Sequence, residues 1–172
     1  MVARDLQGDD PVSYDFYPMN ETSARIVATW RYPAPYDIYD TPPDAVEEAV
    51  QGFLDPQYAY HALTNEGEEL VAYCCFGLDA RVPGGDYGFD ALDIGMGVRP
   101  DLTGQGRGAG FVRAVLAFAQ DAYAPVAFRV TVAEFNERAQ RVWKKADFGP
   151  EQTFARRGDG MAFVVLTLKN PH

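Results

Sequence analysis

The residues best suited to chemistry lie in a glycine-rich segment from Thr103 to Gly108. The segment lies between an expected strand over 91–98 and an apolar helical pattern that continues to about Tyr123. Alternating glycines allow main-chain N–H groups to converge without Cβ atoms in the way. The start of the helix adds unpaired N–H groups and the positive end of the helix dipole. The segment is therefore suited to binding a phosphate or pyrophosphate group.

Three classes of phosphate-binding loop have glycines in such an arrangement. A P-loop needs Lys and Ser or Thr after its last glycine, whereas Ala109 follows Gly108 here, which excludes that class. Residues 104–109 match the dinucleotide pattern G-x-G-x-x-G/A, with Glu134 as an acidic partner for the ribose. Against this second class, five residues separate the strand from the first glycine, and the chain that follows is too short for the second half of a dinucleotide fold.

The third class accounts for more of the sequence through two motifs. The first is Val98-Arg99-Pro100 followed by the glycine segment. The second is Asn136-Glu137-Arg138-Ala139 followed by Trp143 and Phe148. Over residues 88–149 this chain resembles the GNAT family of acetyl-CoA-dependent N-acetyltransferases. It departs from the family pattern at Thr103, where Gln or Arg is usual, and at Asp147, which replaces a glycine.

The resemblance implies that main-chain amides of the glycine segment bind the pyrophosphate of coenzyme A (CoA). It also implies that the strand before the segment binds pantetheine, and that a backbone N–H stabilises the oxyanion during direct transfer to an amine. The residues expected to bind acetyl-CoA are Met96, Gly97, Val98, Thr103, Gly104, Gln105, Gly106, Arg107, Gly108, Ala109 and Asn136. We expect the Thr103 hydroxyl to add a hydrogen-bond donor. Asn136 could instead be a plain helix N-cap. Arg99 and Arg107 could be either phosphate ligands or solvated surface residues.

Two positions concern acid–base chemistry. The family commonly has a tyrosine that protonates the departing thiolate, where this chain has Trp143, whose indole supplies no acidic proton. Water or another hydroxyl could replace it. An amine with a pKa of about 10 must lose a proton before it attacks. Asp93 is the candidate catalytic base, or else an ordinary strand carboxylate; Asp90 and Glu134 are weaker alternatives, and a water relay would leave no signature.

The pocket for the acceptor amine should come from the connection between the first two expected helices. Aromatic side chains crowd around two prolines in that segment, and they could wall an amine or stack with it. The residues are Trp30, Tyr32, Tyr36 and Tyr39. The same residues could instead form a small core cluster or the contact of a homodimer.

Hydrophobic periodicity predicts the element order β-α-α-β-β-β-α-β-α-β-β. The expected strands are 13–17, 58–63, 70–76, 91–98, 126–132, 148–154 and 161–168, and the expected helices are 22–30, 41–53, 108–123 and 136–145. This order predicts an α/β (α+β mixed sheet) fold with flanking helices, in a single domain over 12–172 after a flexible tail over 1–11. The two glycines of strand 91–98 predict a bulge or a close backbone approach.

Composition excludes several classes of protein. The 172 residues include 47% apolar and 23% charged side chains, with a net charge of −10, which argues against general nucleic-acid binding and against docking on anionic membranes. There is no signal-peptide pattern and no apolar run of roughly 20 residues, so a cytoplasmic location is expected. The adjacent Cys74 and Cys75 are unsuited to a disulfide, and His61 and His172 are too few for a His/Cys metal cluster.

Two hypotheses for function follow from the sequence. The first is an N-acetyltransferase that uses acetyl-CoA and acts on a small amine or a peptide α-amine, with the acidic net charge favouring a cationic acceptor. The second is a non-catalytic CoA-binding or sensory module, which the departures at Thr103 and Trp143 would allow.

Overall fold

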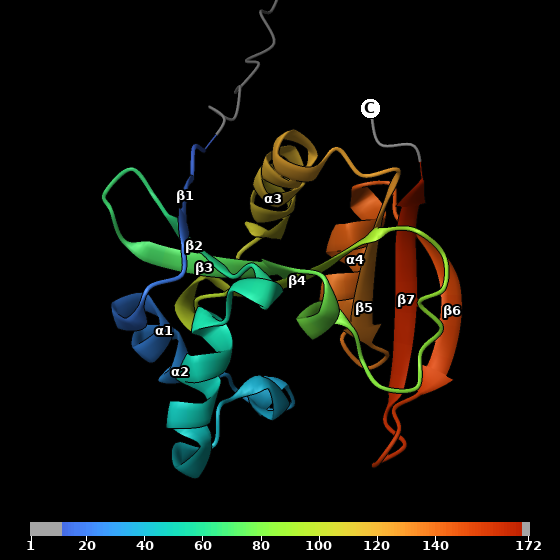
Figure 1. Ribbon diagram of the computed structural model, residues 1–172, viewed down its shortest axis with the longest axis horizontal. Helices are drawn as coiled ribbons and strands as arrows, with labels where there is room; N and C mark the ends of the chain where they lie inside the picture. The colour runs from blue at the N-terminus through green and yellow to red at the C-terminus, as the bar shows by residue number, and fades with distance from the viewer. Residues whose placement is uncertain (1–11, 170–172) are drawn as a thin grey trace, which may run out of the picture.

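The computed structural model describes residues 12–169, and the predicted element order is confirmed in it. The tail expected over 1–11 lies outside the described residues. The elements are β1 (Asp15–Pro18), α1 (Glu21–Ala28), α2 (Val46–Leu54), β2 (His61–Thr64), β3 (Leu70–Phe76), β4 (Leu92–Val98), α3 (Gly108–Tyr123), β5 (Ala127–Ala133), α4 (Glu137–Lys145), β6 (Gly149–Ala155) and β7 (Ala162–Lys169). Figure 1 shows their arrangement.

Two predicted boundaries were wrong because prolines begin short 3-10 turns. The helix expected over 41–53 starts with the turn Pro43–Ala45, and α2 follows it. The strand expected from residue 58 is preceded by the turn Pro56–Tyr58, which Asp55 caps by accepting a hydrogen bond from the Gln57 N–H at 3.0 Å. A proline lacks the N–H that a strand or helix interior needs, so these residues take turn positions instead.

The seven strands form one mixed sheet in the order β1-β2-β3-β4-β5-β7-β6. In the described part of the chain β4 and β5 are the one parallel pair, and they are paired only at Leu92–Phe128 and Asp93–Arg129. Beyond Asp93 the two strands separate, and Figure 1 shows the two halves of the sheet diverging there. The rest of β4 is therefore left without a partner strand on its β5 side.

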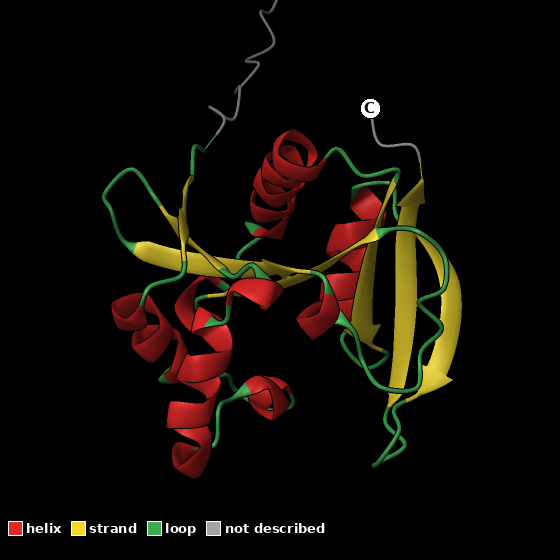
Figure 2. Cartoon of the chain, viewed as in Figure 1, coloured by secondary structure: helices red, strands yellow, loops and turns green. Residues whose placement is uncertain are grey.

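Helices cover both faces of the sheet. α1 and α2 lie on one face of the first half, while α3 lies on the other (Figures 1 and 2). The main core joins α3 and α4 to the sheet through residues such as Phe111, Trp143 and Phe128. A second core packs α1 and α2 against β2 and β3, with Val50 fully buried in it.

The glycines of β4 allow close approach of side chains from β3. No register shift interrupts the pairing of β3 with β4, so the bulge considered from the sequence is not found there. A Cβ at Gly95 would lie 2.6 Å from Cys75 Sγ, and one at Gly97 would lie 2.3 Å from Tyr73 Cε1. The other interpretation, a close approach, is confirmed.

Two findings bear on the sequence-based exclusions. Within residues 12–169 no helix is long and apolar enough to cross a membrane, and no group of three or more His, Cys, Asp or Glu is placed to hold a metal ion. Cys74 and Cys75 are both free and buried, and burial raises the pKa of each thiol.

Candidate active site

A cavity of about 350 Å³ opens where β4 and β5 separate. The glycine segment, α4, β4, β5 and the segment over 32–39 all line it. The segment over 32–39 meets the start of α4, where Tyr39 contacts Asn136 and Tyr36 contacts Arg138. Nine of the residues predicted to bind the cofactor line this cavity: Met96, Gly97, Val98, Thr103, Gly104, Gly106, Gly108, Ala109 and Asn136. Their role as ligands stays a prediction, but the fold does bring them together.

The main chain of β4 faces the cavity at every second residue. The Gly77 N–H donates to Asp93 O and the Arg99 N–H to Val71 O, each at 2.9 Å, which fixes the odd-numbered residues as those bonded to β3. Hydrogen-bonded positions alternate in an antiparallel pair. The N–H and C=O groups of Ile94, Met96 and Val98 therefore point toward the side where β5 has moved away.

The glycines of the loop are required for two different reasons. Gly104 and Gly106 have φ angles of 72° and 75°, the left-handed region that favours glycine. At Gly108 a Cβ would lie 2.9 Å from Val142 Cγ2, so a side chain there would push α3 away from α4. The loop is thus held open by backbone conformation and by helix packing, with its N–H groups next to the cavity.

Two side chains of the loop are engaged in its own structure. Thr103 Oγ1 donates to Pro100 O at 2.7 Å, and Gln105 Nε2 donates to Asp101 O at 2.6 Å. The expectation that the Thr103 hydroxyl adds a donor for the ligand is therefore wrong. Gln105 and Arg107 do not line the cavity, and Arg99 is paired with Asp101 at 2.7 Å.

Two basic residues of α4 line the cavity and were not predicted as site residues. They are Arg138 and Lys145, which are seven residues apart and so lie on one face of the helix. Arg138 Nη1 lies 3.3 Å from the position that a Cβ on Gly104 would take, which places this guanidinium beside the glycine loop. Their seven-residue spacing along the predicted helix was the sequence signal that could have identified both as residues on one face.

Tyr32, Tyr36 and Tyr39 form the part of the cavity wall beside β4 and the start of α4, which is called the tyrosine wall below. Tyr32 Oη donates to Val98 O at 2.8 Å, and Tyr39 Oη accepts from Asn136 Nδ2 at 3.2 Å. The Tyr36 ring lies under the Arg138 guanidinium, 4.2 Å from its centroid to Cζ. These three predicted acceptor residues thus contact elements of the predicted cofactor site, and all three line the cavity.

Two aromatic residues differ from the prediction. Trp30 is only 8% exposed within the α1–α2 core and does not line the cavity, because its ring packs against Tyr73 instead, with centroids 6.0 Å apart. Tyr73 itself, on β3, lines the cavity and was missed. Alternation along β3 gives its face, but only the tertiary fold shows that this face meets the cavity.

The model of the acetyltransferase (GNAT) family matches residues 24–148 of this sequence. This chain belongs to the GNAT family. The match runs from within α1 to just past α4 and so includes β4, the glycine loop, α3 and α4. No curated protein matches the sequence at a significant level.

Solved GNAT structures share the fold at low sequence identity. A spermidine N-acetyltransferase chimera of Vibrio cholerae SpeG and hSSAT superposes with a TM-score of 0.71 at 12% identity, over 91% of this chain and 95% of that one. An acetyltransferase of the GNAT family from Bacillus anthracis gives a TM-score of 0.70 at 12% identity, over 92% and 98% of the two chains. At this identity the likeness shows the fold alone.

Trp143 occupies the position of the tyrosine that GNAT enzymes commonly use as an acid. Its indole is 5% exposed, lines the cavity and packs against Phe148 with centroids 5.0 Å apart. The position therefore holds a packing side chain without an acidic proton.

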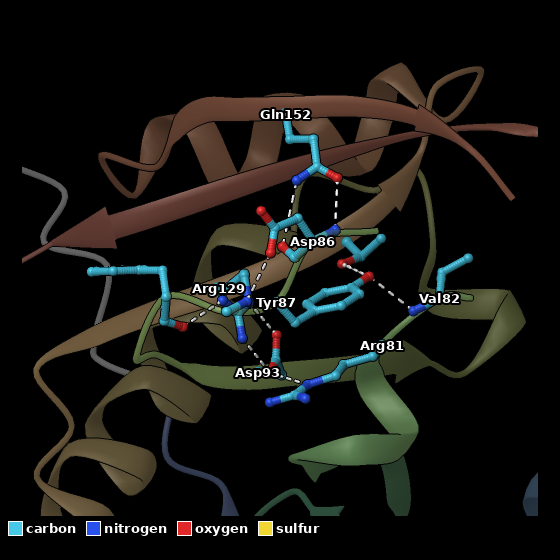
Figure 3. Close-up of polar contacts among 10 residues, drawn as sticks. Arg81, Val82, Asp86, Tyr87, Asp93, Arg129 and Gln152 are labelled. Atoms are coloured by element: carbon cyan, nitrogen blue, oxygen red, sulfur yellow. Dashed lines mark hydrogen bonds and ion pairs between the residues drawn. The ribbon is translucent and has the colours of Figure 1, made fainter. Parts of the chain in front are cut away.

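Asp93 does not face the GNAT cavity, contrary to what a catalytic base requires. Its Oδ1 accepts from Arg129 Nε at 2.5 Å, and its Oδ2 accepts from Arg129 Nη2 and from Arg81 Nε, each at 2.8 Å (Figure 3). Asp93 and Arg129 are each 2% exposed. The hydrogen bonds that Arg129 donates to Asp93 also raise the pKa of Arg129. The carboxylate is thus part of a buried ion pair and has no access to an amine in the cavity.

The two arginines join Asp93 to the connection between β3 and β4. Arg129 Nη1 donates to Phe89 O at 2.8 Å, and its Cζ lies 4.9 Å from the centroid of the Tyr87 ring. Figure 3 shows Tyr87 between Arg81 and Arg129. The weaker candidates Asp90 and Glu134 do not line the cavity either. In the part of the chain that the structure describes, the cavity wall contains no carboxylate.

Proposed function

We propose that this GNAT protein is an N-acetyltransferase that moves an acetyl group from acetyl-CoA directly to a primary amine of a small molecule or peptide. One observation carries the proposal: the glycine loop, the unpaired edge of β4 and the tyrosine wall line one and the same cavity. Donor and acceptor could therefore meet beside β4 without a covalent enzyme intermediate.

The residues present fit CoA at the glycine-loop end. The loop N–H groups and the start of α3 suit a pyrophosphate, and Arg138 and Lys145 supply positive charge on the same wall. The N–H and C=O of Met96 and the N–H of Val98, which point away from β3, suit the amides of pantetheine. When bound, acetyl-CoA supplies an activated acetyl thioester.

The residues of the chain would then position the amine and polarise the acetyl group. A β4 N–H that faces the gap can stabilise negative charge on the acetyl oxygen, since the strand already orients it and it needs no reorganisation. Burial raises the pKa of Tyr32 to about 12, with Asp40 adding to the shift, so its hydroxyl keeps its proton and holds Val98 O. The tyrosine wall offers rings against which an amine can pack.

The proton of the amine leaves by a route other than a wall carboxylate. No carboxylate of the described residues lines the cavity. We therefore propose that the amine binds as its free base or loses its proton to solvent. This route needs no ionised acid among apolar side chains, where a charge would be costly.

The test is the release of thiol from acetyl-CoA, with mass spectrometry of the acetylated product. The acceptors would be spermidine, 2-phenylethylamine, phosphinothricin and a peptide with a free α-amine. Acetylated product that forms at the rate of thiol release supports the proposal. CoA binding without turnover of any amine would favour the second candidate, a CoA-binding module, which the packing role of Trp143 already allows.

A further inference from the structure

With Trp143 in place of the usual tyrosine, the departing sulfur lacks its usual hydrogen-bond partner, and the other hydroxyls of the cavity wall are the candidates to replace it. Three are already engaged with protein groups. Tyr32 Oη donates to Val98 O, and Thr103 Oγ1 donates to Pro100 O. Thr131 Oγ1 lies 3.0 Å from Tyr87 Oη, away from the tyrosine wall.

The remaining candidates differ in position. Tyr36 stacks under Arg138 beside the glycine loop, and Tyr39 Oη accepts from Asn136 at the start of α4. Tyr73 alone among them lies directly across from β4, paired with Gly97 in the β3–β4 register. Its hydroxyl therefore adjoins the strand on which the thioester is proposed to lie.

The geometry around Gly97 fixes the Tyr73 ring over β4. A Cβ on Gly97 would lie 2.3 Å from Tyr73 Cε1 and 2.7 Å from Tyr73 Oη, so only glycine leaves room for the ring. Trp30, Phe53 and Tyr60 pack around it with centroid distances of 6.0, 5.9 and 6.0 Å. Within residues 12–169 the Tyr73 hydroxyl makes no hydrogen bond, and it lines the cavity.

On the basis of the proposed function, we infer that Tyr73 donates a hydrogen bond to the sulfur that leaves during acetyl transfer. As the amine nitrogen bonds to the acetyl carbon, the C–S bond breaks and its electron pair moves to sulfur, where the Tyr73 hydroxyl stabilises the charge. The nitrogen releases its proton to water, and the thiolate takes one from water. Burial raises the pKa of Tyr73, which agrees with a hydroxyl that donates and keeps its proton.

The test measures the thiol of bound CoA directly, without an acceptor. Ultraviolet absorbance of the thiolate is titrated with pH for CoA bound to the native protein and to Tyr73→Phe, after subtraction of the free protein. A hydrogen bond that favours the thiolate lowers the thiol pKa, so we expect the native value to be about one unit below that of the variant. Phenylalanine keeps the ring over Gly97, so packing is preserved.

Tyr60→Phe is the matched control. Tyr60 belongs to the same aromatic cluster and donates its hydroxyl to Asp79, but it does not line the cavity. We expect the thiol pKa of CoA bound to this variant to equal the native value. Equal thiol pKa values in native protein and Tyr73→Phe, or equal shifts in both variants, would overturn the assignment.

Turnover gives a second readout with the acceptor that reacts in the thiol-release assay. Tyr73→Phe should lower kcat about tenfold and leave the calorimetric Kd for CoA unchanged. An unchanged kcat would contradict the inference and leave the proposed function intact. A protein that binds no CoA would instead overturn the proposed function and this inference with it.

Discussion

Asp93 shows how a residue with suitable chemistry can have another use. On sequence alone it is a carboxylate on the strand expected to hold the thioester. In the structure Arg129 and Arg81 occupy both of its oxygens, and the pair with Arg129 is buried. Those two arginines are 36 and 12 residues away in the sequence, so no local pattern predicts the ion pair.

Removal of the Asp93 charge should destabilise the fold. Asp93→Asn leaves the buried Arg129 guanidinium without its anion, and breaking such a pair costs about 3–5 kcal/mol. The free energy of unfolding in urea measures the loss. Asp90→Asn, at an exposed position three residues earlier, is the control and should change stability by less than about 0.5 kcal/mol. If Asp93→Asn keeps full stability but loses turnover, Asp93 is catalytic after all.

Gly97 should tolerate no side chain. In Gly97→Ala the new Cβ would overlap the Tyr73 ring, which cannot move freely within its aromatic cluster. Overpacking of this kind costs about 1–3 kcal/mol, measured by thermal or urea unfolding. Gly52→Ala on α2 is the comparison, because a Cβ there meets nothing within 4 Å. Equal stability of the two variants would mean that the Tyr73 ring is not held over β4.

At the scale of elements, the glycine loop and the start of α3 form one unit. Gly106 has a φ of 75° with nothing near its missing Cβ, so Gly106→Ala tests backbone conformation alone. Alanine in the left-handed region costs about 1–2 kcal/mol. We expect weaker CoA binding by calorimetry, by roughly tenfold if the loop relaxes to another conformation.

Gly110→Ala supplies the control for that variant. Gly110 lies within the first turn of α3, also has nothing within 4 Å of a Cβ, and does not line the cavity. Alanine is favoured over glycine in a helix, so stability should rise by about 0.5–1 kcal/mol with no loss of CoA affinity. Equal affinity of both variants for CoA would contradict the role of the loop conformation.

Elements were predictable where periodicity is strong. The strands and helices from β3 to β7 lie within a few residues of their predicted ranges, because alternation and helical spacing reflect the faces that are buried. The loop could be recognised because its glycines lie close together in the sequence, at every second position from 104 to 108. The hydrogen bond from the Thr103 hydroxyl to Pro100 O could not be predicted from the sequence, since it depends on the 3-10 turn Pro100–Leu102.

At the scale of the whole molecule, the cavity exists because one sheet divides into two halves. Its walls combine Tyr32 from the first third of the chain, Tyr73 from β3 and Arg138 from α4. Sequence motifs identified the glycine-loop residues proposed to bind CoA, because these residues are close in sequence. Tyr32 could also be named from its aromatic, proline-rich segment, whereas Tyr73 could not, because only the fold brings its face of β3 to the cavity.

Because of the tyrosines around the cavity, the free energy of unfolding should vary with pH in the alkaline range. Burial raises the pKa of Tyr32 from 10.0 to about 12 and also raises the pKa values of Tyr39 and Tyr73. Between about pH 10 and 12 the unfolded chain has therefore lost phenolic protons that the native protein keeps. The free energy of unfolding should fall as pH rises through this range. Urea unfolding in this range checks it, and a constant or rising value would contradict the burial of these hydroxyls.

The proposed chemistry depends most on the cavity between β4 and β5 as the site for CoA. Calorimetric titration of the native protein with CoA tests this most directly. We predict saturable binding of one CoA per chain, with affinity weakened in Gly106→Ala and retained in Gly110→Ala. The absence of binding heat, together with no protection of the glycine loop from hydrogen exchange when CoA is added, would contradict the account.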